Sequence, residues 1–99
     1  MIEHTVTFNL KHSPGSQEEQ QFFDAANDLA EIPGVIDFAI RRQVSEKHSH
    51  AFGITMFFAS DDEYQAYNSH PLHTAFVENR WKKEVTDFQE ADFVRLDLS

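Results

Sequence analysis

The nine residues after Met1 alternate without exception between two kinds of side chain. One face of an extended chain would carry Ile2, His4, Val6, Phe8 and Leu10, and the other face Glu3, Thr5, Thr7 and Asn9. This period of two predicts a β-strand that buries one face. His4 is the odd member of the otherwise apolar face, which makes it a candidate functional residue.

A helix and two further strands are expected in the next fifty residues. Residues 16–19 have the Ser-x-x-Glu form of a capping box, and apolar residues at helical spacing continue to about Ile32, where Pro33-Gly34 ends the pattern. Strands are expected over residues 35–44 and 50–58. The second of these strands begins an apolar row with another histidine, since its face would carry His50, Phe52, Ile54, Met56 and Phe58.

The last forty residues predict two helices that meet at a proline, followed by a strand. Residues 60–63 repeat the capping-box form, and this helix should end near Ser69 because the residue before a proline is disfavoured in helical geometry. Pro71 suits the first position of the next helix, which we expect to run to about Val85. A fourth strand is expected over residues 92–98, and we assign no element to residues 86–91.

This order of elements, β-α-β-β-α-β, predicts an α+β fold of the ferredoxin-like type, with a four-stranded antiparallel sheet and helices on one face. The side chains on the other face of the sheet are too small and too mixed in character for a surface exposed to solvent. This face would carry Thr5, Thr7, Ala51, Gly53, Thr55 and Phe57. A second copy of the sheet would cover it well, so we expect a homodimer with sheet-to-sheet packing.

Composition limits the classes of function that remain. The 99 residues suit a single domain over 1–99, and a formal net charge of −9 argues against nucleic acid and acidic lipid surfaces as partners. No segment reaches the ~20 apolar residues of a membrane span, and Met1 leads straight into the first strand without a signal or transit peptide. The absence of cysteine removes thiolate ligands and nucleophiles. We therefore expect a cytoplasmic protein.

Residues 64–76 concentrate the polar and aromatic side chains that could carry chemistry. This stretch holds Tyr64, Tyr67, His70, His73 and Phe76 around Pro71. Imidazole near neutral pH can accept or donate a proton, and a phenol can hold an enolate oxygen, which together suit proton abstraction next to a carbonyl. The histidine spacings do not form a recognisable metal motif, so no metal is expected.

These residues resemble the stress-responsive A/B barrel family over nearly the whole chain. The resemblance rests on His4, on residues 32–35 (Ile-Pro-Gly-Val), on His50, on the Tyr-x-x-His-Pro-x-His-x-x-Phe pattern of residues 67–76, and on Asp97. It implies a dimeric α/β-barrel with a small-molecule pocket between sheet and helices. In a plant polyketide cyclase of this family, the positions of Tyr67 and His73 are catalytic, and two strand histidines match His4 and His50.

The resemblance thus implies Tyr67 and His73 as catalytic residues without a cofactor. The ligand-binding candidates are His4, His50, Phe52, His70, Phe76 and Trp81. Three hypotheses about function stay open: a pocket protein with no assigned reaction, a cyclase or lyase that uses Tyr67 and His73 as an acid-base pair, and a structural or stabilising protein. For each histidine the alternative is a buried ring satisfied by its neighbours, and for His70 it is a cap at the helix break.

Overall fold

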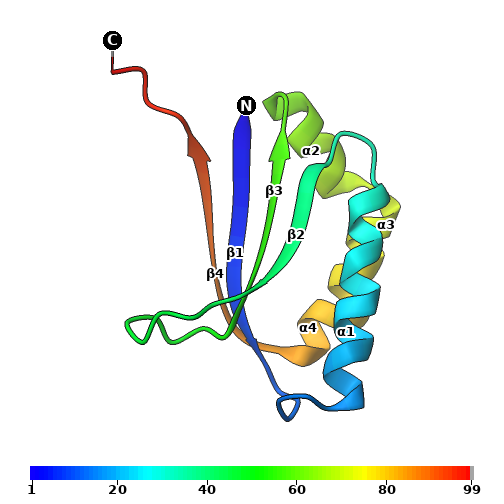
Figure 1. Ribbon diagram of the computed structural model, residues 1–99. Coiled ribbons are helices and arrows are strands. Elements are labelled where there is room, and N and C mark those ends of the chain that lie inside the picture. Colours follow the sequence, from blue (N-terminus) through cyan, green and yellow to red (C-terminus); the bar gives the residue numbers. More distant parts are fainter. Residues whose placement is uncertain (99) are drawn as a thin grey trace.

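The strands form one antiparallel sheet that carries all the helices on one face (Figure 1). The computed structural model describes residues 1–98 of the chain. The strands are β1 (Ile2–Leu10), β2 (Ile36–Arg42), β3 (Phe52–Phe58) and β4 (Val85–Val94), in the spatial order β2-β3-β1-β4. This confirms the predicted α+β, ferredoxin-like architecture.

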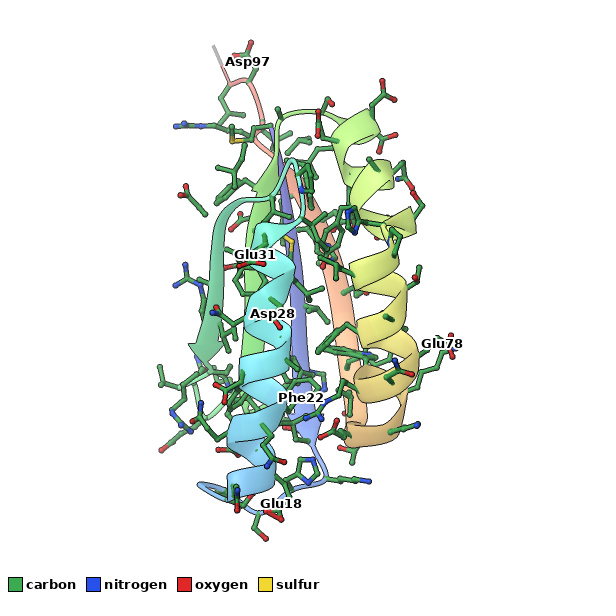
Figure 2. All side chains as sticks on the ribbon, turned by 90° about the vertical axis from the view of Figure 1, so that its right-hand side faces the viewer. Glu18, Phe22, Asp28, Glu31, Glu78 and Asp97 are labelled. Carbon is green, nitrogen blue, oxygen red and sulfur yellow. The ribbon has the colours of Figure 1, made fainter. Side chains whose placement is uncertain are left out.

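Two helical runs lie side by side on the sheet, as Figure 2 shows from the helical side. The first is α1 (Gln17–Asn27) followed by the 3-10 turn η1 (Asp28–Glu31). The second run comprises α2 (Asp61–Ser69), α3 (Pro71–Phe76), the π-helical segment η2 (Val77–Trp81) and the short α4 (Lys82–Glu84). None of the helices in residues 1–98 is long and apolar enough to cross a membrane.

Local side-chain contacts begin and end the helices where the sequence indicates. The Ser16 hydroxyl accepts a hydrogen bond from the Glu19 amide, and Ser60 does the same for Glu63, so both capping boxes form. Pro71 occupies the first turn of α3, where its missing amide hydrogen is not needed. These contacts fix both ends of α2 and thereby the direction in which its tyrosines point.

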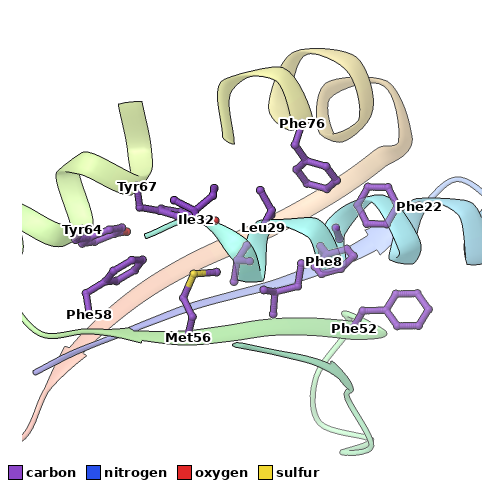
Figure 3. Close-up of a cluster of buried hydrophobic side chains, with 13 residues drawn as sticks. Phe8, Phe22, Leu29, Ile32, Phe52, Met56, Phe58, Tyr64, Tyr67 and Phe76 are labelled. Atoms are coloured by element: carbon purple, nitrogen blue, oxygen red, sulfur yellow. The ribbon is translucent and has the colours of Figure 1, made fainter. Parts of the chain in front are cut away.

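The core is built largely of aromatic rings between the sheet and the two helical runs (Figure 3). Phe8 from β1 packs on Phe22 from α1, with ring centroids 5.8 Å apart, and on Trp81, at 5.0 Å. At the other end of the sheet, Phe58 stacks on Tyr64 with centroids 5.0 Å apart. The Tyr64 end is the more polar around the cavity, because the Tyr64 and Tyr67 hydroxyl groups and the His4 imidazole enter there.

The predicted limits of the fourth strand are wrong. β4 begins at Val85 and ends at Val94, so it covers the stretch to which the sequence assigned no element. Its inward side chains, Phe88 and Glu90, are exposed because β4 is an edge strand that borders a cavity and not the packed core. An apolar alternation was therefore not required there, and the alternation of residues 94–98 lies mostly beyond the strand.

The predicted start of β3 at His50 is also wrong, because the strand begins at Phe52. The Asn9 side chain accepts a hydrogen bond from the Ala51 amide at 2.8 Å and donates one to the Ser49 carbonyl at 3.2 Å. These side-chain contacts replace the regular ladder, so the alternation of β3 does not extend back to residue 50. The loop between β2 and β3 then crosses the face of the sheet away from the helices (Figure 1).

Candidate functional site

A cavity of about 590 Å³ lies between the sheet and the second helical run. Its floor comes from β1, β3 and β4, and its roof from α2, α3 and η2. The deep end holds nearly inaccessible groups, among them His4 and Tyr67, whereas Phe88 and Glu90 are exposed and mark the mouth beside β4. The walls are mostly apolar, and the ionisable or amide side chains on them are His4, Tyr64, Tyr67, Asn68, His73, Lys82 and Glu90.

Tyr67 presents a hydroxyl group that has no hydrogen-bond partner within residues 1–98. Its ring lies with its centroid 4.5 Å from that of His73 and 6.3 Å from that of His4. Burial raises the pKa of the Tyr67 phenol well above its ordinary value, and the negative charge of Glu90 raises it further. The phenol therefore stays protonated near neutral pH and is available as a hydrogen-bond donor to a ligand.

His73 is held in one tautomer by the break between α2 and α3. The Leu72 amide, which would bond the Asn68 carbonyl in a continuous helix, instead donates to the His70 ring at 3.1 Å. The Asn68 carbonyl is left to accept from His73 Nδ1, at 3.0 Å. A carbonyl can only accept, so the neutral ring carries its hydrogen on Nδ1 and a lone pair on Nε2.

The surroundings of His73 favour this neutral form. Burial is the main cause that lowers the pKa of the His73 imidazole, and the nearby His4 lowers it further, although the Asn68 carbonyl and the charge of Glu90 act in the opposite direction. Nε2 is therefore available as a proton acceptor near neutral pH. A proton donor, Tyr67, and a proton acceptor, His73, thus share one wall of the cavity.

His4 is fixed on the floor of the cavity by a carboxylate from β4. Its Nδ1 lies 2.6 Å from Asp92 Oδ1, and the strand register places these two residues directly opposite one another. The Tyr64 hydroxyl donates to the same carboxylate, with oxygen distances of 3.0 and 3.1 Å, and its oxygen is 2.8 Å from His4 Nδ1. The neutral His4 ring therefore carries its hydrogen on Nδ1, and Nε2 has no partner among the described residues.

A π-helical segment forms the wall opposite β4. Such segments are rare and often occur at functional sites because they shift the register of a helix. Val77 and Trp81 of η2 both line the cavity, and Trp81 packs edge to face on Phe88 at the mouth with ring centroids 5.6 Å apart. Nothing in the sequence pattern indicated a π-helix here.

The structure brings together five of the eight predicted site residues. The lining includes His4, Tyr67, His73, Phe76 and Trp81. Phe52 lies outside it, because its ring packs with Phe8 and Phe23 in the filled end of the core. His70 also lies outside the lining and caps α3, so its contribution to the cavity is the release of the Asn68 carbonyl described above.

The expectation that the His50 ring points toward Tyr67 and His73 is wrong. His50 Nδ1 accepts from the Thr7 hydroxyl at 2.8 Å, and Nε2 donates to Asp87 Oδ2 at 2.8 Å. Thr7 belongs to the face of the sheet away from the helices, so the ring lies on the opposite side from the cavity. The irregular backbone before Phe52 is the cause, since the alternation that was used to place His50 stops there.

Two polar residues of the site, Glu90 and Asp92, were missed from the sequence, and Tyr64 was noted in the 64–76 stretch without being assigned to the site. Tyr64 precedes Tyr67 by three residues, and this spacing places both rings on one face of α2. Glu90 and Asp92 could be recognised only from the register of β4 against β1, which sets them opposite Val6 and His4. Within residues 1–98, no group of three or more histidine, aspartate and glutamate side chains is arranged to hold a metal ion.

The whole chain is similar in fold to several solved structures. A ferredoxin-like Dabb family protein from Mesorhizobium loti is 47% identical over 97% of both chains, with a TM-score of 0.94. A dimeric ferredoxin-like protein from Thermobifida fusca is 21% identical, covers 95% of this chain and 90% of its own, and has a TM-score of 0.78. The hydroxynitrile lyase of Passiflora edulis shares the fold at 10% identity, with 99% and 94% coverage and a TM-score of 0.81.

No curated protein matches the sequence significantly. The model of the stress responsive A/B barrel domain matches residues 2–95, which is nearly the whole chain. This match agrees with the 47% identity to the Mesorhizobium loti protein. The chain belongs to the stress-responsive A/B barrel domain family.

Proposed function

We propose that this protein binds a small apolar or aromatic carbonyl compound in the cavity between the sheet and α2–η2. The observation that carries the proposal is the pair of unpartnered groups on one wall: the Tyr67 hydroxyl and His73 Nε2. Both groups lie at the surface of an open cavity, so a ligand that displaces water from it has to pair with them or leave them unsatisfied. The volume of about 590 Å³ is within the ordinary range of small-molecule sites.

Trp81 offers a direct test of binding because it lines the cavity and is the chain's single tryptophan. Its indole N–H should give one cross-peak in a ¹H–¹⁵N NMR spectrum, and acetophenone should shift this peak in a saturable way. Tyr67→Phe removes the expected donor to the ketone oxygen, so the dissociation constant should rise about fivefold, the value of one net hydrogen bond.

Gln65→Ala is the matched control for the acetophenone titration. Gln65 lies on α2 like Tyr67, but its side chain is exposed and outside the cavity. This variant should bind acetophenone like the wild type. If acetophenone and benzyl alcohol both leave the Trp81 peak unmoved at millimolar concentration, the proposed binding function is wrong. Unfolding midpoints of both variants check that each is folded.

The paired donor and acceptor also support a second candidate, an enzyme of the cyclase or lyase type. His73 Nε2 would remove a proton from the carbon next to the carbonyl, the C–H electrons would form a C=C bond, and Tyr67 would hold the resulting enolate oxygen by its O–H group. The tautomer fixed by Asn68 supports this assignment. A hydroxynitrile lyase is among the proteins that share the fold.

Proton exchange tests this candidate without knowledge of the natural substrate. In D₂O, the wild-type protein should speed loss of the acetophenone methyl signal, followed by ¹H NMR. His73→Gln should lower the catalysed rate by about 100-fold, the lower end of what a general base contributes. If acetophenone binds but its exchange rate does not exceed that in buffer, the protein binds the ketone without catalysing proton exchange. If acetophenone neither binds nor exchanges, the third hypothesis, a structural protein, is favoured.

We also propose that the chain forms a homodimer through the sheet face away from the helices. Similar proteins are described as dimeric, among them the one from Thermobifida fusca. On this face Phe93 is 55% exposed, and Thr5, Thr55 and Phe57 are only partly covered within one chain. Static light scattering at micromolar concentration should give twice the mass of the 11.5 kDa chain. A monomer would contradict the proposal.

A further inference from the structure

The mouth of the cavity carries a carboxylate that no cation neutralises. Glu90 projects from the edge strand β4 onto the cavity surface, and no lysine, arginine or histidine of residues 1–98 forms an ion pair with it. Its charge reaches the interior, because it acts on the titration of Tyr64, Tyr67 and His73. An uncompensated negative charge beside a binding site repels anions and attracts cations.

The cations near the mouth are already paired with other carboxylates. Lys82 lines the cavity, but its Nζ lies 2.6 Å from Glu78 Oε1. Arg80 on the same helical run is held by Glu84, with Nε 2.9 Å from Oε2. A ligand carboxylate that entered the cavity would meet Glu90 and would have to compete with Glu78 for Lys82 and with Glu84 for Arg80, and the net charge of −9 would oppose its approach.

The same mouth offers two aromatic rings to a cation. Trp81 and Phe88 pack edge to face at this mouth, with ring centroids 5.6 Å apart, and Phe88 is 51% exposed. Glu90 follows Phe88 by two residues on the same face of β4, so the carboxylate and the rings border a single opening. Aromatic faces combined with a carboxylate suit an ammonium group.

From this arrangement we infer that the cavity takes ligands with a neutral or cationic group at the mouth and rejects carboxylates, with Glu90 as the residue that sets this preference. The inference rests on the proposed binding function and adds the charge class of the ligand. It assigns different parts of one molecule to different parts of the site: a carbonyl group to Tyr67 and an uncharged or amino group to the mouth.

Two pairs of ligands of matched size test the charge preference. Benzoate and benzamide differ in charge but share a shape, and benzylamine and benzyl alcohol do the same. With the Trp81 indole peak as readout, benzamide should bind about five times more tightly than benzoate, and benzylamine about three times more tightly than benzyl alcohol. Such factors correspond to one charge interaction across a partly solvated site.

Glu90→Gln removes the charge and keeps the shape, so it should raise benzoate affinity about threefold and leave benzamide affinity within about twofold. Glu31→Gln is the matched control. It removes the same charge from the exposed surface of η1, away from the cavity (Figure 2), and should change neither affinity.

The outcomes separate the two proposals. If acetophenone, benzamide and benzyl alcohol all fail to bind the wild type, the binding function itself is wrong. If they bind but benzoate binds as tightly as benzamide, the charge preference is wrong. Equal effects of Glu90→Gln and Glu31→Gln would show that net charge acts and would overturn the role of Glu90.

Discussion

Two buried histidines pair with two aspartates of the same strand, yet they occupy opposite faces of the sheet. His4 is 6% exposed and lies 2.6 Å from Asp92, whereas His50 is 5% exposed and lies 2.8 Å from Asp87. The aspartates are five positions apart on β4, an odd number, so their side chains leave the strand in opposite directions. One histidine therefore borders the cavity and the other borders the face away from the helices.

The two pairs differ most in which ring nitrogen is used. His50 engages both nitrogens within the protein, since Thr7 donates to Nδ1 and Asp87 accepts from Nε2. His4 directs only Nδ1 at its partners, so Nε2 has no partner among the described residues. A buried histidine beside a carboxylate is thus not by itself a functional signal, because the free nitrogen distinguishes a site from a structural tie.

The largest expected effect that separates the pairs is on stability. His50→Ala removes a buried ring with two hydrogen bonds and unties the loop between β2 and β3, so we expect the free energy of unfolding to fall by about 2–3 kcal/mol. Urea unfolding at a fixed protein concentration measures it. Affinity for acetophenone should stay within about twofold, because His50 lies on the other side of the sheet.

His48→Ala is the control in the same loop. Its ring is exposed, and it accepts one hydrogen bond from the His50 amide, so the loss should be about 0.5 kcal/mol. If His50→Ala lowers the free energy of unfolding no more than His48→Ala does, the proposed structural role of His50 is wrong. If His50→Ala lost much of its affinity for acetophenone and kept its stability, His50 would contribute to the cavity, and the two histidines would not differ in role.

A smaller effect is expected when the two carboxylates are removed. Asp92→Ala deprives two buried donors, His4 and Tyr64, of their acceptor, so we expect a loss of about 1–2 kcal/mol. Asp87→Ala affects only His50, and the Asp87 side chain is 63% exposed, so about 0.5 kcal/mol should be lost. Equal losses in urea unfolding would show that the Tyr64 contact adds nothing.

The fold could be predicted from the sequence because its main signals are local. The alternation of β1, the capping boxes of Ser16 and Ser60, and the proline between α2 and α3 each specify structure within a few residues. The fourth strand was expected, but most of its true span escaped prediction because its inward positions Phe88 and Glu90 face the cavity and its mouth. Apolar periodicity reports burial, and a strand that borders an open volume lacks it.

The part of the site on the helices, together with His4 on β1, could be predicted, whereas the residues of β4 and the position of His50 could not. Tyr67 and His73 were identified through the family resemblance, and the cap of α2 and the break at Pro71 hold both side chains at the cavity. The placement of His50 depended on regular alternation before Phe52, and Asn9, more than forty residues away, interrupts it. Asp92 required the register between the first and last strands, which no local pattern contains.

His73 differs from both His4 and His50, because its ring bonds a backbone carbonyl and no carboxylate. Burial lowers its pKa below the ordinary 6.5, so on acidification the unfolded chain takes up this proton first. The contribution of His73 to stability is therefore complete above about pH 6.5 and is lost as the pH falls from there toward the folded pKa.

The measurement is the free energy of unfolding of the wild type minus that of His73→Gln, compared at pH 7.5 and pH 5.5. The substitution leaves the other titrating groups in place, so the contributions of groups distant from His73 cancel in this difference, whereas those of His4 and Glu90, which interact with His73, remain in it. The difference should be smaller at pH 5.5. A difference that stays constant or grows on acidification would mean that the folded protein does not disfavour the charged ring.

The smallest expected effect moves a single hydrogen and no heavy atom. When neutral, His4 and His73 should carry the hydrogen on Nδ1, because Asp92 and the Asn68 carbonyl accept there, whereas His50 should carry it on Nε2, because Asp87 accepts there. Long-range ¹H–¹⁵N NMR spectra distinguish the two tautomers.

In Asp92→Ala, the Tyr64 hydroxyl, 2.8 Å from His4 Nδ1, is free to donate to that nitrogen, so His4 should move its hydrogen to Nε2. His50 should keep its tautomer in the same variant. If His4 already carries its hydrogen on Nε2 in the wild type, it presents a donor and not a lone pair to the cavity, and the difference between the two histidine–aspartate pairs disappears.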